Sequence, residues 1–404
     1  MSINFTFYLL LINIIISPLY VIRWKIFGMP TTLLELSVFA TIIVWLVSNL
    51  SKGQLRTIAR LIITDRLFWP IVVLISSGIA SLMVTDDLRG GLGIFKAYLV
   101  EPVILYFIAR QIVNNQNRNF IFLAFQVVIV WLAIIAFIQF TTGKLSFFAP
   151  SEIAQGRVSA VFNNANAVGL YLGPILAVTI AAIFSNRGVF KITSLVTAVI
   201  ALSTIYLTKS QGAYLAVFVS LAGVLTVWVL QTKIDYLALK RLIISSFVAL
   251  ILLGGLLPAL TLFLPELTPA IVTENYQGAN TYQIRNYLWR GTLDLLSDHP
   301  LLGAGLNGFK NLYFRDYRLP QYHEALQYPH NFYLTFWAEL GLLGIIGLLM
   351  ILLKLIDFIF GRKKINLGLY VFLTYILVHG IVDVPYFKND LSLEFWLITA
   401  LFLI

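Results

Sequence analysis

The sequence predicts an all-α membrane protein in which one chain crosses the bilayer about twelve times. Of its 404 residues, 59% are hydrophobic and only 11% are charged. A soluble protein carries about 45–50% apolar and about 25% charged residues, so this composition excludes a cytosolic enzyme and a disordered chain. The chain has no cysteine, which excludes disulfides, thiolate zinc sites and iron–sulfur clusters.

Twelve segments are apolar and long enough for a bilayer core, which takes roughly 20 residues of α-helix to cross. We predict one membrane-embedded domain over 1–404, with no separate soluble domain. The first segment lacks the basic start and the small-residue cleavage site of a secretory signal, so it is expected to remain as a span. The predicted spans are 3–22, 32–50, 67–84, 93–113, 119–141, 166–184, 190–207, 212–230, 242–264, 330–353, 366–384 and 390–404.

The basic residues predict the orientation, because the cytoplasmic loops of membrane proteins are rich in Lys and Arg. The net charge is +10, and the loops that follow even-numbered spans hold most of the cations found in short loops. This distribution accounts for the positive charge without a nucleic-acid partner, and it places both ends of the chain in the cytoplasm. The cations in these loops are Lys52, Arg56, Arg60, Arg66, Arg110, Arg118, Arg187, Lys191, Lys233, Lys240, Arg241, Lys354, Arg362, Lys363 and Lys364.

The longest connection, 265–329, then lies on the outer side of the cytoplasmic membrane. Within it, 282–297 has apolar residues at helical spacing, which predicts an amphipathic helix that ends before Pro300. A second short helix is expected over 306–318. The basic residues of this loop are Arg285, Arg290, Lys310, Arg315 and Arg318.

The motif Tyr-Pro-His-Asn at 328–331 opens the tenth predicted span. Proline favours the first turn of a helix, so His330 is expected at a helix N-terminus, where the dipole disfavours an imidazolium ion. Such a histidine is a candidate general base, and a structural histidine is the alternative. At 100° per residue, Gly341 lies about 20° from His330 and Gly344 about 40° to the other side, so a continuous helix carries all three on one stripe. Glu339 faces the opposite way and is expected to pair with another helix.

Several cations near the outer surface are candidates for binding a pyrophosphate. Arg285 and Trp289 are four residues apart and share a helix face, as do Arg290 and Asp294. Arginines hold phosphate oxygens through paired, charge-assisted hydrogen bonds, whereas the alternative for Arg290 and Asp294 is a surface ion pair. Two further candidates, just before the predicted spans eight and six, are Lys209 and Arg157.

The glycine motif at 303–308, Gly-Ala-Gly-Leu-Asn-Gly, has the spacing of a dinucleotide-binding loop. It follows a predicted helix rather than a strand, so a tight turn is expected instead. The sequence has no metal-binding signature, and we predict no cofactor. Charged residues inside predicted spans are candidates either for a proton or substrate path or for structural pairing between helices, and they are Lys96, Glu101, His379, Asp383 and Glu394.

These motifs resemble the O-antigen ligase family, which also includes polymerases of lipid-linked polysaccharides and some protein O-oligosaccharyltransferases. The similarity covers about residues 150–350. Family members typically have Ser-Arg-Gly where this chain has Ser210, Gln211 and Gly212, so a phosphate-binding arginine is missing and Lys209 is its candidate substitute. The matching segments are 157–166 (RVSAVFNNAN), 208–216 (TKSQGAYLA), 285–289 (RNYLW), 299–305 (HPLLGAG), and His330-Asn331 with Gly341 and Gly344.

The resemblance implies a GT-C-like, metal-independent, inverting enzyme at the outer face of the cytoplasmic membrane. It would transfer a glycan from undecaprenyl pyrophosphate to an acceptor hydroxyl, with His330 as the base and with the prenyl chain in an apolar groove. The cations expected to stabilise the leaving pyrophosphate are Arg285 and Arg290. The residues expected to contact substrate are Lys209, Arg157, Asn331, Trp289 and Gln211.

Alternative functions remain open at this point. A ligase uses lipid A core, a protein or another carrier as acceptor, whereas a polymerase uses a second lipid-linked repeat; the intact histidine motif favours the ligase. A transporter or flippase of lipid-linked sugars also fits twelve spans, but it typically shows a repeat across its middle and functional charges at mid-bilayer. Here the distinctive residues lie in or beside the outer loop, which favours an enzyme.

Overall fold

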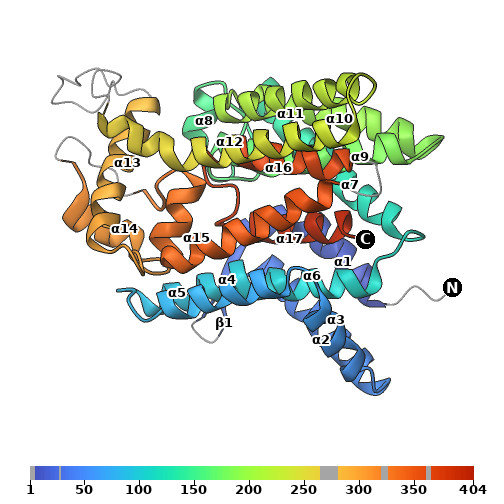
Figure 1. Ribbon diagram of the computed structural model, residues 1–404, viewed down its shortest axis with the longest axis horizontal. Helices are drawn as coiled ribbons and strands as arrows, with labels where there is room; N and C mark the ends of the chain where they lie inside the picture. Colours follow the sequence, from blue (N-terminus) through green and yellow to red (C-terminus); the bar gives the residue numbers. More distant parts are fainter. Residues whose placement is uncertain (1–4, 27–28, 264–280, 320–325, 361–364) are drawn as a thin grey trace.

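The computed structural model describes residues 5–26, 29–263, 281–319, 326–360 and 365–404. The predicted all-α class is confirmed: this described part is almost entirely helical, and most of the long helices run along the longest axis of the molecule (Figure 1). Helices suit so apolar a chain because they satisfy their own backbone hydrogen bonds where water is absent. Residues 265–280 of the predicted outer loop, and the basic residues Arg362, Lys363 and Lys364, lie outside the described residues.

The first half of the chain contains the only two strands among the described residues, a short antiparallel hairpin of β1 (Arg23–Ile26) and β2 (Met29–Thr32). Thr32 and Glu35 cap the helix that follows through reciprocal hydrogen bonds of 3.1 Å each. The helical elements of this half are α1 (Phe5–Ile16), η1 (Ser17–Val21), α2 (Leu33–Ser51), α3 (Leu55–Thr64), α4 (Phe68–Ser81), α5 (Leu88–Ile94), the π-helix η2 (Phe95–Val100), α6 (Glu101–Ile112), α7 (Arg118–Thr142) and α8 (Pro150–Ala154).

The second half contains the predicted site. The amphipathic helix expected over 282–297 is present as α13 (Thr281–Asp298), and the second short helix is present as α14 (Phe309–Leu312) with the π-helix η4 (Tyr313–Tyr317). The remaining helices are α9 (Ala165–Ser185), α10 (Val189–Leu207), α11 (Gln211–Leu230), α12 (Tyr236–Phe263), α15 (Phe332–Ile359), α16 (Leu367–His379) and α17 (Asn389–Phe402).

Helices occupy all twelve of the predicted span positions. Within the described residues, eight helices are long and apolar enough to cross a membrane. Shorter apolar helices lie at Phe5–Val21, Phe68–Ser81 and Leu367–His379. The total of twelve crossings therefore stays a prediction. Helix α1 and the end of α17 lie toward the end of the molecule opposite α13 and α14 (Figure 1).

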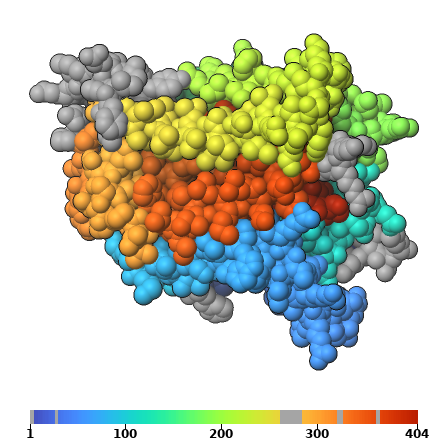
Figure 2. Space-filling model, in the orientation of Figure 1, coloured from blue at the N-terminus to red at the C-terminus, as the bar shows by residue number. Residues whose placement is uncertain are grey.

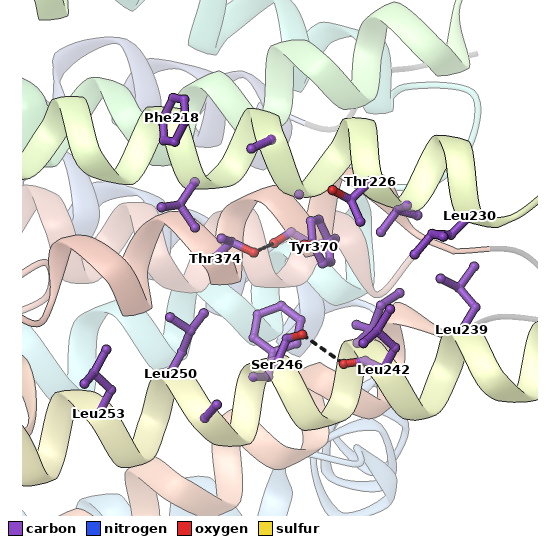
Figure 3. A pocket seen from close by; sticks show the side chains of 17 residues that line it. Phe218, Thr226, Leu230, Leu239, Leu242, Ser246, Leu250, Leu253, Tyr370 and Thr374 are labelled. Atoms are coloured by element: carbon purple, nitrogen blue, oxygen red, sulfur yellow. Dashed lines mark hydrogen bonds between the residues drawn. The ribbon is translucent and has the colours of Figure 1, made fainter.

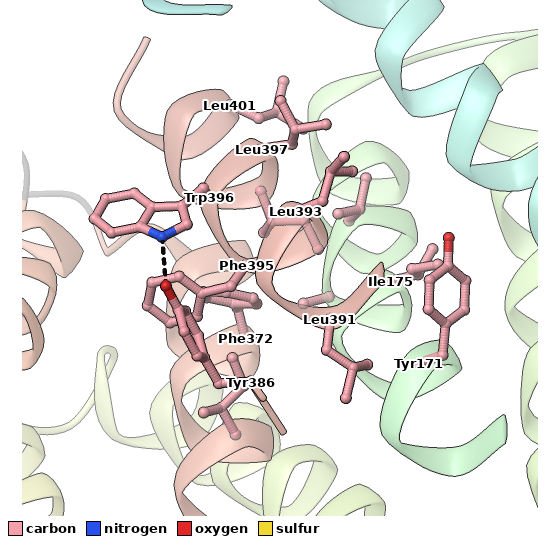
Figure 4. Close-up of a cluster of buried hydrophobic side chains, with 14 of the residues drawn as sticks. Tyr171, Ile175, Phe372, Tyr386, Leu391, Leu393, Phe395, Trp396, Leu397 and Leu401 are labelled. Atoms are coloured by element: carbon pink, nitrogen blue, oxygen red, sulfur yellow. Dashed lines mark hydrogen bonds between the residues drawn. The ribbon is translucent and has the colours of Figure 1, made fainter. Parts of the chain in front are cut away.

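The core of the molecule is built around α9, α16 and α17. Burial is extensive in these helices: 17 of the 21 residues of α9 and 12 of the 13 residues of α16 are buried. Figure 4 shows aromatic and leucine side chains of this core, where Trp396 Nε1 donates a hydrogen bond of 3.0 Å to Tyr386 Oη. In the space-filling view, α12, α15 and the helices α4–α6 form parallel bands over the visible face (Figure 2).

Helix α15 is broken at Gly341, whose φ of 68° and ψ of −171° are not helical. The segment after α13 fills the break: Leu342 N donates to Leu301 O at 2.9 Å, and Ala304 N donates to Ala338 O at 2.7 Å. A Cβ at Gly341 would lie 2.3 Å from Leu301 O, so this close approach requires glycine.

The structure around the break in α15 corrects two predictions. The single stripe of His330, Gly341 and Gly344 was wrong, because it assumed one continuous helix and the helix direction changes at Gly341. Glu339 was expected to pair with another helix, but its Oε2 accepts a hydrogen bond of 2.6 Å from Asn307 N in the glycine-rich turn. That turn, 303–308, packs on α15 as a structural loop.

Candidate functional site

A polar cavity of about 450 Å³ lies at the N-terminus of α11, beside the end of α16. Parts of the chain that are far apart in sequence form its wall: the segment before α9, the segment before α11, helix α13 and the turn after α16. It therefore gathers four of the predicted site residues in one place. The lining residues are Arg157, Asn166, Lys209, Ser210, Gln211, Gly212, Leu215, Arg285, His379, Val382 and Asp383.

His330 reaches this cavity through Asp383. His330 Nδ1 lies 3.1 Å from Asp383 Oδ1, and Asp383 is only 5% exposed. An ionised carboxylate can only accept a hydrogen bond, so the histidine donates Nδ1–H and its Nε2 keeps a free lone pair. The segment is also tied by its backbone, because Phe332 N donates to Gly380 O at 2.7 Å.

The local position of His330 differs from the prediction. The helix begins at Phe332 with Asn331 as its N-cap, so His330 lies one residue before the cap and not in the first turn. Its φ of 52° is in the left-handed region, which a non-glycine residue rarely occupies and which is common at functional sites. Lys209 has the same unusual conformation, with a φ of 53°.

The polar groups of Asn331 and Trp289 are bonded to the protein backbone. Asn331 is fully buried; its Nδ2 donates to Gly254 O and Ile381 O, each at 3.0 Å, and its Oδ1 accepts from Leu334 N at 2.9 Å. These bonds join α12, α15 and the turn after α16. Trp289 Nε1 donates to Pro329 O at 3.1 Å, which holds the residue before His330. Both side chains position the histidine segment.

Arg285 stands beside the carboxylate of Asp383. Its Nε donates a hydrogen bond of 2.6 Å to Val382 O, in the turn beyond the end of α16. Asp383 lies close to His330, His379 and Arg285, and neighbouring groups that donate hydrogen bonds or carry positive charge favour the ionised form of a carboxyl group. Asp383 is therefore a carboxylate at neutral pH, as a hydrogen-bond acceptor for His330 must be.

Arg290 is not among the residues that line the cavity. It lies five residues beyond Arg285 on α13, which is about 140° around the helix. Both arginines were expected to stabilise the leaving pyrophosphate, but the structure places them on different faces of α13.

The N-terminus of α11 adds partial positive charge to the cavity. Gln211 and Gly212 begin this 20-residue helix after the N-cap Ser210. The backbone N–H groups of these two residues, which have no acceptor within the helix, therefore lie at the cavity. Lys209 precedes them, and its Nζ makes only a long contact of 3.4 Å with Gln155 O. This end of α11 is suited to bind an anion.

Arg157 is held by three partners. Its guanidinium pairs with Glu152 Oε2 at 2.8 Å, donates to Thr208 O at 3.0 Å and donates to Asn166 Oδ1 at 2.8 Å. These bonds fix its orientation at the cavity wall, and Glu152 offsets part of its charge. Lys209 and Arg285 are the other two cations that line the cavity.

An apolar groove of about 510 Å³ continues along α11, between α12 and α16 (Figure 3). Leu215 lines the cavity and Phe218 lines the groove, three residues further along the same helix. Two hydroxyls at the groove bond within their own helices: Ser246 Oγ donates to Leu242 O at 2.9 Å and Thr374 Oγ1 donates to Tyr370 O at 2.8 Å. The groove therefore presents an apolar surface next to a cationic cavity.

Sequence reasoning gave no specific role to two residues of the site, Asp383 and His379. Both were noted only as ionisable residues in an apolar span, which is the one signal that marked them. The pairing of Asp383 with His330, 53 positions away, follows from the packing of α15 on α16.

Residues 196–349 match the family model described as O-antigen ligase. No curated protein matches the chain. The matched segment runs from α10 to α15 and contains Lys209, Arg285 and His330, whereas Arg157 and Asp383 lie outside it. The chain therefore carries an O-antigen ligase domain over residues 196–349, which supports the resemblance to the O-antigen ligase family.

Proposed function

We propose that this member of a family of membrane enzymes for glycan assembly transfers a glycan from undecaprenyl pyrophosphate to an acceptor hydroxyl. The observation that carries the proposal is the chain of contacts from His330 through Asp383 to the cationic cavity with Arg285. A base and a phosphate-binding cation are thereby held next to each other on a buried scaffold. We place the site at the outer face of the cytoplasmic membrane, with both termini in the cytoplasm.

His330 is the proposed general base. With Nδ1–H given to Asp383, the free Nε2 accepts the proton of the acceptor hydroxyl. The hydroxyl oxygen then bonds to the anomeric carbon from the face opposite the pyrophosphate, and the bond from that carbon to the phosphate oxygen breaks with its electron pair on the phosphate. The configuration at the anomeric carbon inverts, and undecaprenyl pyrophosphate is released.

The cavity supplies the charge that the leaving pyrophosphate requires. Arg285 and Lys209 line it together with the N-terminus of α11, and Arg157 is oriented there by Glu152. Fixed positive groups at the point where negative charge grows lower the barrier to departure. We therefore propose that these protein cations, and no metal ion, stabilise the leaving group.

The apolar groove along α11 is the proposed path of the prenyl chain. It starts within one helical turn of the cavity, because Leu215 and Phe218 are three residues apart. A pyrophosphate in the cavity would therefore have its lipid chain in the adjoining groove. The residues Phe218 to Leu230 span about 18 Å along the helix, more than half of a bilayer core of about 30 Å.

The proposal is tested with purified protein in liposomes and a synthetic undecaprenyl-pyrophosphate glycan. We expect a glycosidic product and free undecaprenyl pyrophosphate, and His330→Gln should abolish both. Donor that crosses the liposome membrane without a glycosidic product would support a flippase and reject the enzyme.

The size of the product distinguishes the two enzymes. One glycan transferred to lipid A core, a protein or another carrier identifies the ligase that we propose, with its intact histidine motif. A ladder that grows on the lipid carrier identifies a polymerase instead.

A further inference from the structure

His379, the last residue of α16, lines the cationic cavity directly, whereas His330 is connected to it through Asp383. It is only 1% exposed, so it meets the cavity with one edge of its ring. The mechanism proposed above gives it no role. Its hydrogen bonds, however, determine what that edge can do.

The Nδ1 side of His379 is a hydrogen-bond donor. Tyr375 Oη donates its single proton to Gly169 O at 2.8 Å. The same Oη lies 3.2 Å from His379 Nδ1, and it has no second proton to give, so it accepts from Nδ1–H. In the neutral ring, Nε2 therefore carries a lone pair.

The Nε2 side lies at the wall of the cavity. A Cβ at Gly212, which also lines the cavity, would be 3.0 Å from His379 Cδ2 and 3.1 Å from His379 Nε2. On the other side of the ring, a Cβ at Gly169 would be 3.8 Å from Cε1. The imidazole is thus clamped between α9 and α11, and Nε2 is held next to the start of α11.

Other residues of the cavity supply positive charge for the phosphate, so His379 is not needed as a further cation. The groups near the ring are Asp383, Arg285 and Tyr375, with Lys209 and Arg157 on the same cavity. A pyrophosphate diester has two negative charges; Arg285, Lys209 and Arg157 supply three positive charges on this cavity, and Asp383 supplies one negative charge. A neutral acceptor beside these cations fits a hydroxyl group, because its lone pair would oppose a phosphate oxygen.

We propose that His379 Nε2 accepts a hydrogen bond from a hydroxyl of the donor sugar that is attached to the pyrophosphate. Tyr375 acts through the histidine, as a positioning residue that fixes the tautomer. The proposal rests on the proposed glycosyl transfer and names the group that reads the donor sugar in it.

The test uses His379→Asn and His379→Gln in the full-length protein. Asparagine has an amide near the place of Nδ1 and keeps a donor to Tyr375, but it leaves the place of Nε2 empty. Glutamine places an amide oxygen near Nε2. The probes are undecaprenyl pyrophosphate alone and undecaprenyl pyrophosphates that carry a single glucose, galactose or 2-acetamido counterpart, with their monodeoxy analogues. Equilibrium affinity is measured for each.

We expect His379→Asn to lower the affinity for the sugar-bearing probe that binds best by about three- to tenfold, the scale of one neutral hydrogen bond. Binding of undecaprenyl pyrophosphate alone should change less than about twofold, and His379→Gln should recover most of the loss. One monodeoxy analogue should bind wild type as weakly as the parent sugar binds His379→Asn, with no further loss in the variant. Tyr375→Phe should lose affinity in the same sugar-dependent way.

Tyr171→Phe is the matched control, because it removes an equally buried tyrosine hydroxyl that contacts Ser17 away from the cavity. It should leave all affinities unchanged. Equal weakening of the bare carrier and the sugar-bearing probes by His379→Asn would assign His379 to the phosphate and overturn the proposal, as would no weakening of any sugar-bearing probe. Failure of wild type to transfer any glycan is a separate outcome that rejects the proposed function itself.

Discussion

His330 and Asp383 lie 53 positions apart in the sequence, and the contact between Nδ1 and Oδ1 is 3.1 Å. The histidine precedes the cap of α15, and the aspartate follows the end of α16. The Asp383 carboxylate also lies beside Arg285 and His379, so it connects the proposed base to the cavity. This arrangement makes the two halves of the site depend on one another.

His330→Ala should lower the rate by at least about 10²-fold, the usual effect of losing a general base. Asp383→Asn should lower it by at least about tenfold, because the amide no longer fixes the tautomer. If Asp383 acts through His330, the double variant should be little slower than His330→Ala. Turnover of donor under saturating conditions measures all three variants, and thermal unfolding checks that they fold. Full additivity would mean that Asp383 has a role of its own.

Arg285→Lys should reduce kcat/KM about ten- to a hundredfold, because lysine keeps the charge but loses the planar fork that holds Val382 O and, in the proposed function, a phosphate oxygen. Arg315→Lys is the control. Arg315 lies in the same outer segment, its side chain is 63% exposed, and it pairs with its neighbour Asp316. Steady-state kinetics with the lipid-linked donor compares them; a similar loss in both variants would make Arg285 an ordinary surface charge.

Gln211→Arg should lower the KM for donor by about three- to tenfold. Gln211 is exposed at the start of α11 and lines the cavity, so an arginine there adds a guanidinium beside Lys209 without entering the core. The gain should shrink as the salt concentration rises, since exposed charges are screened. A KM for donor that stays at the wild-type value at low salt would contradict a phosphate at this end of α11.

Ala222→Trp should fill part of the apolar groove on α11. We expect the KM for an undecaprenyl donor to rise by about tenfold, since a prenyl chain that loses buried area there loses affinity. A donor with two isoprene units should be unaffected. Val199→Trp, on α10 and already 63% exposed, provides a control for added bulk at the lipid-facing surface. If both donors lose affinity equally, the groove does not hold the chain.

Gly341→Ala should lower the free energy of unfolding by at least about 1–3 kcal/mol, because its φ of 68° disfavours a side chain and the new Cβ would meet Leu301 O at 2.3 Å. Gly255→Ala, in α12, has no atom within 4 Å of its new Cβ and should be neutral or stabilising by up to about 1 kcal/mol. Unfolding in detergent, followed by circular dichroism, measures both. Equal stability of the two variants would show that position 341 accepts a side chain and that the break does not require glycine.

The positions of the long helices could be predicted from sequence because spans are apolar and of nearly constant length. The predicted helix at 282–297 was also found, as Thr281–Asp298, since its apolar residues recur at helical spacing. Three predicted cations, Arg157, Lys209 and Arg285, lie on one cavity. They could be named from residue type and side of the membrane, without any knowledge of packing.

The rest depended on contacts between distant segments. The break at Gly341 was missed because a helical projection assumes regular φ and ψ, and only the approach of Leu301 shows why the helix opens. Asn331 was expected to orient the histidine or the sugar; its amide bonds to Gly254 and Ile381, which no local pattern indicates. The orientation of Asp383 toward His330 likewise follows from how α16 ends beside α15.

The hydrogen bonds that bridge the break in α15 have a practical consequence for chimeric enzymes. Two backbone hydrogen bonds join the segment after α13 to α15: Ala304 N donates to Ala338 O, and Leu342 N donates to Leu301 O. A domain exchange with a relative that cuts the chain between them would separate donors from acceptors inside an apolar environment. A chimera is therefore best built by exchanging 281–344 as a single segment, so that both backbone bonds keep their donor and acceptor.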